Sequence, residues 1–88
     1  MDIDALKNRR RRVVGMRETL KKIAQGTVLC VYIAQDAEAR VIEEIVNQST
    51  TRHIPIEYVG SMDELGRLCG IEVGAACAAL LPEQRSFA

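Results

Sequence analysis

The residues best suited to holding a ligand are concentrated in the heptapeptide GMRETLK, residues 15–21. A helix beginning after Gly15 would display free backbone N–H groups and a partial positive charge, which favour a phosphate. Gly15 has no side chain and would let a ligand's backbone approach closely. Arg17, Glu18 and Lys21 fall within one helical turn and could reach one ligand together. Taken alone, the heptapeptide is better explained as an ordinary solvated helix start, because charged helix faces are common.

Other residue types that catalyse reactions or bind metals are few. Cys30, Cys69 and Cys77 are odd in number, form no C-x-x-C pair and sit in apolar contexts, so we expect buried thiols. His53 is the single histidine and is expected in an exposed loop. No phosphate loop, dinucleotide fingerprint or nucleophile elbow is present. We therefore expect no enzymatic activity, catalytic residue, metal or cofactor.

Composition restricts the class of protein. The 88 residues are 48% hydrophobic and only 3% aromatic, so the core must be aliphatic. So few aromatic residues argue against binding single strands by base stacking. The sequence has no apolar run of membrane-spanning length and no secretory signal, which predicts a cytoplasmic protein that does not contact a membrane.

Charge is distributed unevenly although the net charge is zero. Residues 1–26 carry eight Lys/Arg and three Asp/Glu, a net +5, and residues 27–88 carry a net −5. A basic first third could present a positive face to a polyanion such as RNA. The alternative is that the basic segment simply pairs with the acidic remainder.

Hydrophobic periodicity predicts alternating helices and strands. Asp36 is expected to cap the helix that follows it, and Ser61 with Glu64 forms a capping-box pattern. Residues 75–81 are ambiguous, since their alanines favour a helix and their length favours a strand. This pattern predicts an α/β fold with helices on both faces of a sheet, in a single domain over residues 1–88. Helices are expected over residues 2–10, 16–25, 37–48 and 62–69, and strands over 11–14, 27–34 and 54–59.

Two segments together resemble a known family. Residues 15–21 resemble the Gly-x-Asn-Glu-x-x-Lys signature of the kink-turn RNA-binding family, the ribosomal L-seven-Ae/L-thirty-e superfamily. Residues 65–76, LGRLCGIEVGAA, resemble its second signature in the form seen in small bacterial members. The resemblance covers residues 3–82. It implies a three-layer α-β-α sandwich with a four-stranded mixed sheet, and binding to bent RNA with tandem sheared G·A pairs.

The resemblance also implies roles for individual residues. Gly15 would admit the RNA backbone, Glu18 would accept hydrogen bonds from a guanine edge, and Lys21 would reach guanine O6 or a phosphate. Arg17 stands where archaeal members have asparagine, and would pair with phosphate or a purine's major-groove edge. The loop at residues 71–73 would pack against splayed bases. The basic run of four arginines at residues 9–12 would add phosphate contacts, which position the protein without specifying sequence. The full expected RNA-binding set is Gly15, Met16, Arg17, Glu18, Lys21, Lys22, Arg11, Arg12, Ile71, Glu72 and Val73.

Structured RNA, including ribosomal RNA, is thus the expected partner of a monomeric, ribosome-associated ribonucleoprotein component, with ribosomal proteins as further partners. Two other functions remain open. The same fold could serve as a protein-interaction module that uses the loop at residues 71–73 as an anchor. A small α/β enzyme or ligand-binding domain would instead need a pocket at the strand ends near residues 34–36.

Overall fold

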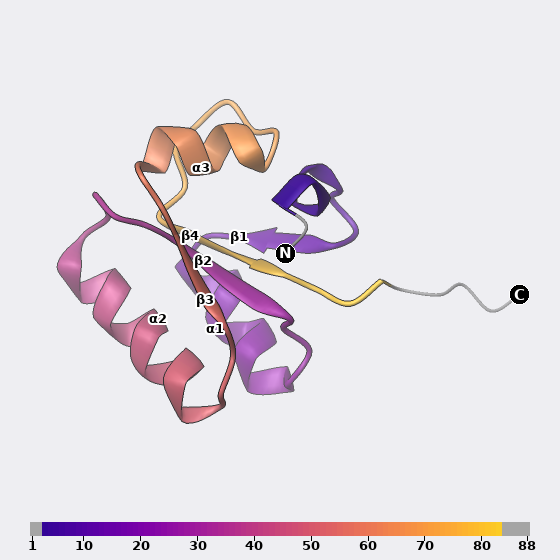
Figure 1. Cartoon of the computed structure of the whole chain (residues 1–88), viewed down its shortest axis with the longest axis vertical. Coiled ribbons are helices and arrows are strands. Elements are labelled where there is room, and N and C mark those ends of the chain that lie inside the picture. The colour runs from indigo at the N-terminus through magenta and orange to yellow at the C-terminus, as the bar shows by residue number, and fades with distance from the viewer. Residues whose placement is uncertain (1–2, 84–88) are drawn as a thin grey trace, which may run out of the picture.

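The computed structural model describes residues 3–83, which fold into a central sheet with helices on both faces (Figure 1). The elements follow one another as a 3₁₀ helix η1, then alternating strands and helices, ending in a strand. Their bounds are η1 Ile3–Lys7, β1 Arg12–Val14, α1 Met16–Gln25, β2 Cys30–Ala34, α2 Ala39–Thr51, β3 Ile56–Val59, α3 Met62–Leu68 and β4 Cys77–Leu80. No helix in this part of the chain is long and apolar enough to cross a membrane.

The sheet is mixed and has the strand order β1-β4-β2-β3. Strands β2 and β3 run parallel, while β4 runs antiparallel to both of its neighbours. Strand β2 lies inside the sheet and is buried along its whole length, which accounts for its continuous apolar sequence. Pro55 immediately precedes the edge strand β3, where a missing N–H costs no ladder hydrogen bond.

Two separate apolar cores make the fold a three-layer α-β-α sandwich. Helices α1 and α2 cover one face around Ile23, Ile33 and Ile45. Helix α3 and η1 cover the other face around Leu6 and Leu65. Figure 1 shows these two layers on either side of the sheet. The predicted sandwich with a four-stranded mixed sheet is confirmed.

Segment 75–81 is a strand, and its small side chains have a physical reason. Strand β4 lies between β1 and β2 and is buried at every position. Alanine side chains are small enough for this central strand, because helices pack against both of its faces. The helical preference of alanine is therefore overridden by tertiary packing.

Three local expectations need correction. The helix expected over residues 2–10 is a short 3₁₀ helix, Ile3–Lys7, and residue 2 lies outside the described part. Helix α2 begins at Ala39 rather than residue 37 and continues to Thr51. Asp36 does not cap α2: its Oδ1 accepts a hydrogen bond from Met62 N, 2.7 Å away, at the start of α3. The end of β2 lies close to that helix start, so a residue distant in sequence supplies the cap.

Candidate nucleic-acid interface

Helix α1 begins in a conformation suited to its glycine. Gly15 has φ 94°, in the region that side chains disfavour, and no side chain caps the helix. Gly15 N donates to Cys77 O at 2.8 Å, and Thr19 N donates to Gly15 O at 3.0 Å. The N–H groups of the first three helical residues, 16–18, precede the first intrahelical bond and point out of the helix start. They form an uncapped, partly positive terminus that can accept an anion.

The structure brings this helix start and the second motif to one edge of the sheet. The Gly15–Cys77 bond joins β1 to the beginning of β4, directly after the loop at residues 70–76. Ala76 O accepts from Ala34 N at 2.9 Å, and Ala75 N donates to Met62 O at 3.0 Å, so the loop's end is fixed. Cys77 lies four residues after Val73, a span of at most roughly 14 Å. The two motifs, about fifty residues apart in sequence, therefore lie within reach of one ligand.

The charged side chains of α1 project into solvent. Arg17, Glu18 and Lys21 are exposed, and within the described residues none of their side chains has a hydrogen bond or ion pair. Lys22 is half-buried, and its Nζ donates to Gln25 Oε1 at 3.5 Å. Three neighbouring charged groups are thus free to bind a ligand without first breaking an internal contact.

Helix α3 begins at the same edge but differs in its electrostatics. Asp36 Oδ1 accepts from Met62 N at 2.7 Å, and Ser61 Oγ accepts from Glu64 N at 3.0 Å. These bonds satisfy two N–H groups of the helix start, and Asp36 adds a negative charge. A phosphate is therefore better accommodated at α1 than at α3.

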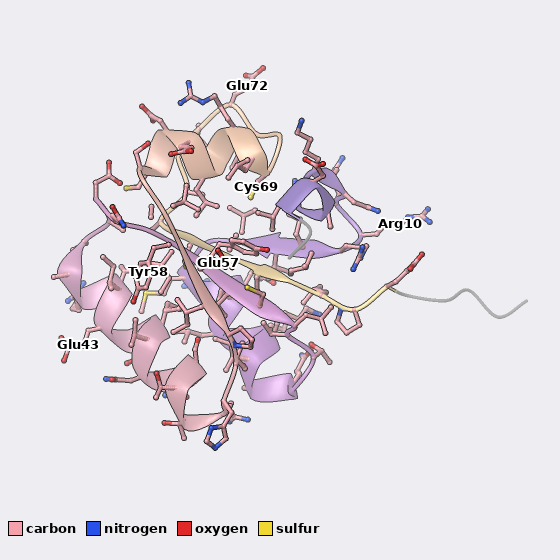
Figure 2. The ribbon with its side chains drawn as sticks, in the orientation of Figure 1. Arg10, Glu43, Glu57, Tyr58, Cys69 and Glu72 are labelled. Atoms are coloured by element: carbon pink, nitrogen blue, oxygen red, sulfur yellow. The ribbon has the colours of Figure 1, made fainter. Side chains whose placement is uncertain are left out.

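The loop after α3 has one anchored and one exposed apolar residue. Ile71 is half-buried and packs against the core beneath α3. Val73 is 69% exposed, the largest value among the exposed large hydrophobic side chains of the described residues. Glu72 lies between them and points away from the protein above α3 (Figure 2). Of the predicted apolar pair, Val73 is thus the side chain that a ligand can meet directly.

Two glycines that the sequence reading did not single out hold this loop against α3. A Cβ on Gly66, inside α3, would collide with Val73 O, and one on Gly74 would meet Met62 Cβ at 3.2 Å. Gly66 thus allows a close backbone approach that only glycine permits, whereas a side chain at position 74 would require Met62 to shift slightly. A glycine inside a predicted helix is unusual, and this feature of the sequence could have identified Gly66 as a packing position.

Arg12 has a different environment from the rest of its basic run. Its Nε donates to Leu6 O and its Nη2 to Cys69 O, each at 3.1 Å. The guanidinium therefore ties β1 to η1 and to the end of α3, where the loop begins. Two of its donors are engaged within the protein, and its expected contact with phosphate stays a prediction.

The remaining arginines of that run are separated from the helix start. Residues 9–11 precede β1, and Gly15 follows it, so the strand lies between them. Three strand residues span roughly 10 Å. The basic run and Gly15 are neighbours in sequence, but the structure places them at opposite ends of β1.

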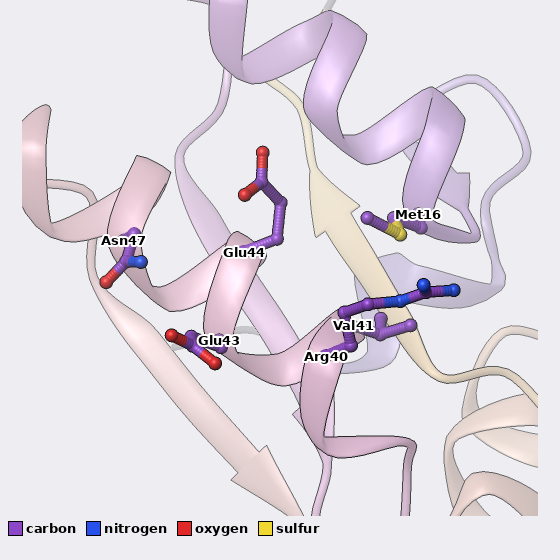
Figure 3. A pocket seen from close by; sticks show the side chains of 6 residues that line it. All are labelled: Met16, Arg40, Val41, Glu43, Glu44 and Asn47. Carbon is purple, nitrogen blue, oxygen red and sulfur yellow. The ribbon is translucent and has the colours of Figure 1, made fainter.

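A hollow of about 460 Å³ lies between the start of α1 and α2. Figure 3 shows its lining side chains, among them Met16, Arg40, Glu43 and Glu44. Met16 is half-buried against the α1–α2 core, with its side chain lining this hollow and its backbone N–H at the start of α1. The acidic lining of this hollow disfavours phosphate. The hollow also does not lie at residues 34–36, where the enzyme alternative requires a pocket.

The cysteines are buried, as their contexts predicted. Burial raises the pKa of the thiols of Cys30, Cys69 and Cys77 above the ordinary value of 9.0. The Arg12 charge partly offsets this for Cys69, and a hydrogen bond with Thr19 does so for Cys77. No cluster of His, Cys, Asp or Glu within residues 3–83 is arranged to hold a metal ion.

Comparison with known proteins identifies the class to which this fold and edge belong. Residues 2–87 match the Ribosomal protein L7Ae/L30e/S12e/Gadd45 family. The match spans nearly the whole chain, and the protein belongs to this family. The family membership indicated by the two sequence motifs is confirmed.

Individual relatives support the assignment. An RNA-binding protein from Halalkalibacterium halodurans is 50% identical over 68 residues, covering 77% of this chain and 83% of that protein. An RNA-binding protein from Caldanaerobacter subterraneus subsp. tengcongensis is 49% identical over 69 residues, covering 78% and 84%. The solved structure of a Giardia lamblia 15.5kD RNA binding protein has a TM-score of 0.84 and 24% identity, covering 92% of this chain and 71% of that one. This last likeness concerns the fold.

Proposed function

We propose that this protein binds RNA and recognises a kink-turn, a sharp bend flanked by tandem sheared G·A pairs. The observation that carries the proposal is the 2.8 Å hydrogen bond from Gly15 N to Cys77 O. It joins the uncapped start of α1 to the strand that follows the exposed Val73 loop. One surface thus offers N–H donors, free charges and an apolar contact. The relatives named as RNA-binding proteins support the same reading.

Each group on this surface suits a different part of a bent RNA. The N–H groups at the start of α1 and the absent side chain of Gly15 would hold a phosphate of the bend. Glu18 would accept hydrogen bonds from a guanine's N–H groups, a contact that a cation cannot make. Lys21, one turn further along, would bind guanine O6 or a phosphate. Val73 would pack on a splayed base, because irregular RNA is read through unstacked bases and distorted shape.

The cellular setting follows from this recognition. We propose a cytoplasmic, monomeric, non-enzymatic protein that associates with the ribosome, where structured RNA and ribosomal proteins would be its partners. Arg17 has hydrogen-bond donors and no acceptor, so it would pair with a phosphate or with the major-groove edge of a purine.

Substitutions on α1 test the residue roles. Glu18→Gln keeps the shape but removes the charge, and should weaken kink-turn binding roughly 10-fold, since hydrogen bonds to a charged group contribute about 1.5–3 kcal/mol. Lys21→Ala should weaken it by a similar factor. Affinity is measured by titration at one stated salt concentration, with circular dichroism to check the fold.

Two charge substitutions elsewhere on the protein serve as controls. Glu57→Gln on the edge strand β3 matches Glu18→Gln, and Arg52→Ala directly after α2 removes an exposed cation as Lys21→Ala does. Both should leave affinity within twofold. The proposal is wrong if folded Glu18→Gln and Lys21→Ala proteins bind as tightly as these controls.

The exposure of Val73 favours one second candidate, a protein-interaction module. An exposed valine on a fixed loop could anchor a partner protein. Val73→Ser would then abolish binding of that partner, whereas Lys21→Ala would not affect it. RNA recognition ranks higher, because the uncapped helix start and the unpaired charges beside it have no role in the alternative.

A further inference from the structure

Lys7, Arg9, Arg10 and Arg11 form a basic turn outside the interface described above. The turn has its own hydrogen bonds: Asn8 N donates to Ala5 O at 3.0 Å, and Arg11 N donates to Asn8 O at 2.9 Å. Asn8 Oδ1 also accepts from Arg10 N at 3.0 Å. The backbone that carries these cations is therefore fixed. Arg9 and Arg10 are exposed, and Figure 2 shows Arg10 extending away from the protein.

Lys22 of α1 extends this basic surface. Arg11 O accepts from Leu81 N at 2.7 Å, which places the basic turn beside the end of β4. Lys22 and Leu81 together line a hollow of about 170 Å³. Two separate elements, the turn before β1 and the last turn of α1, thus bring cations to the same segment of chain.

The charges here are unbalanced. Arg11 Nε is buried without a hydrogen-bond partner, and within residues 3–83 the turn's cations form no ion pair. The nearby anions are Asp4 on η1 and Glu83, which lines the hollow with Lys22. Both are exposed and neither neutralises a specific cation.

We propose that the basic turn and Lys22 form a second RNA-contacting surface, which holds the phosphate backbone of the helical stem adjoining the bend bound at α1. This inference rests on the proposed function. Strand β1 separates the turn from Gly15 by roughly 10 Å, so the two surfaces would meet different phosphates of one RNA. An RNA stem fits better than a protein partner, because this surface is a run of guanidinium groups with free donors, and among residues 3–83 no aromatic side chain belongs to it. Such contacts position a ligand without reading its sequence.

The test compares two kink-turn RNAs that share one bend and differ in stem length. The Arg9→Ala/Arg10→Ala protein should bind the long-stem RNA about 5- to 10-fold more weakly than wild type does. Its plot of log affinity against log salt should be shallower by roughly two, because each lost phosphate contact removes about one. Binding to an RNA with its stem cut close to the bend should change less than twofold.

Controls separate specific contacts from net charge. Arg9→Lys/Arg10→Lys keeps the charges and should retain most of the long-stem affinity. Arg52→Ala removes a cation at the far end of α2 and should not discriminate between the RNAs. Equal weakening on both RNAs, or none on the long stem, would overturn the inference.

A plain RNA duplex distinguishes failure of this inference from failure of the proposed function. If wild type binds bent and Watson–Crick-paired RNAs equally, kink-turn recognition is wrong. The second surface is then judged on the duplex alone, where Arg9→Ala/Arg10→Ala must still reduce affinity and salt dependence. An unchanged duplex affinity would reject it.

Discussion

At the scale of single residues, the arginines near the start of the chain have different environments. Arg12 is held by two backbone carbonyls, whereas Arg17 has no partner within the described residues. Their side chains are chemically identical, so the difference comes from the elements around them. Sequence alone grouped Arg12 with its basic neighbours. The bond to Cys69 O, 57 residues away, could not be predicted from local pattern.

Arg12 should therefore matter for stability. Arg12→Ala removes two hydrogen bonds and leaves two carbonyls without their donor, which should lower the free energy of unfolding by about 2 kcal/mol. Arg12→Lys should recover only part of this, since one ammonium cannot match the fork that reaches both carbonyls. Urea denaturation measures both effects. An Arg12→Ala protein as stable as wild type, but with a shallower salt dependence of RNA binding, would contradict the structural role and favour the phosphate contact.

At the scale of elements, the predictable parts were those with local signals. Helix α1 has the predicted bounds, because its apolar spacing and Gly26 mark it within the sequence. The Ser61 cap of α3 was likewise predictable. Asp36 caps α3 rather than the predicted helix α2, and the sequence of β4 is compatible with either a helix or a strand. Both features depend on neighbouring elements that are distant in the sequence. The two motifs lie together at one edge of the sheet because of the strand order. Local sequence pattern does not reveal that order, so their proximity could be predicted only from the family resemblance.

The close packing of α3 and its following loop can be tested at Gly66. Alanine usually stabilises a helix relative to glycine by up to about 1 kcal/mol. Here the added Cβ would collide with Val73 O, so Gly66→Ala should instead destabilise by about 1–3 kcal/mol and weaken RNA binding through the displaced loop.

Gly60→Ala provides the matched control for that substitution. Its Cβ would meet only the flexible end of Glu64, at 3.0 Å. In thermal denaturation, the midpoint of Gly66→Ala should be clearly lower than that of Gly60→Ala. A Gly66→Ala protein more stable than wild type would show that the loop does not depend on this contact.

At the scale of the whole molecule, the buried cysteines link stability to pH. Burial raises their pKa, so the folded protein keeps its thiols protonated while the unfolded chain ionises near 9.0. Their contribution is fully present below that pH and is lost as the pH rises toward the folded pKa values. Stability should therefore decrease above about pH 9.

A triple variant, Cys30→Ala/Cys69→Ala/Cys77→Ala, isolates this effect. It should be less stable at neutral pH, because smaller side chains leave cavities. Its urea midpoint should nevertheless fall less steeply between about pH 8.5 and 10.5 than that of wild type. An equally steep decline would show that the thiols do not contribute.

The asymmetric charge of the chain also acts at this scale. Net charge is zero, yet most of the unpaired cations among residues 3–83 lie on α1 and before β1, while acidic residues line the hollow along α2. A neutral protein can thus attract RNA to one side.

The most direct test of the central claim is a titration of the wild-type protein with a short kink-turn RNA. The same RNA with its G·A pairs changed to Watson–Crick pairs is titrated alongside at the same salt concentration. Recognition of a bent shape by the α1 start and the Val73 loop predicts binding at least 100-fold tighter to the kink-turn, about 3 kcal/mol. Equal, weak and strongly salt-dependent binding to both RNAs would contradict it, and would leave only general attraction between the basic residues and phosphate.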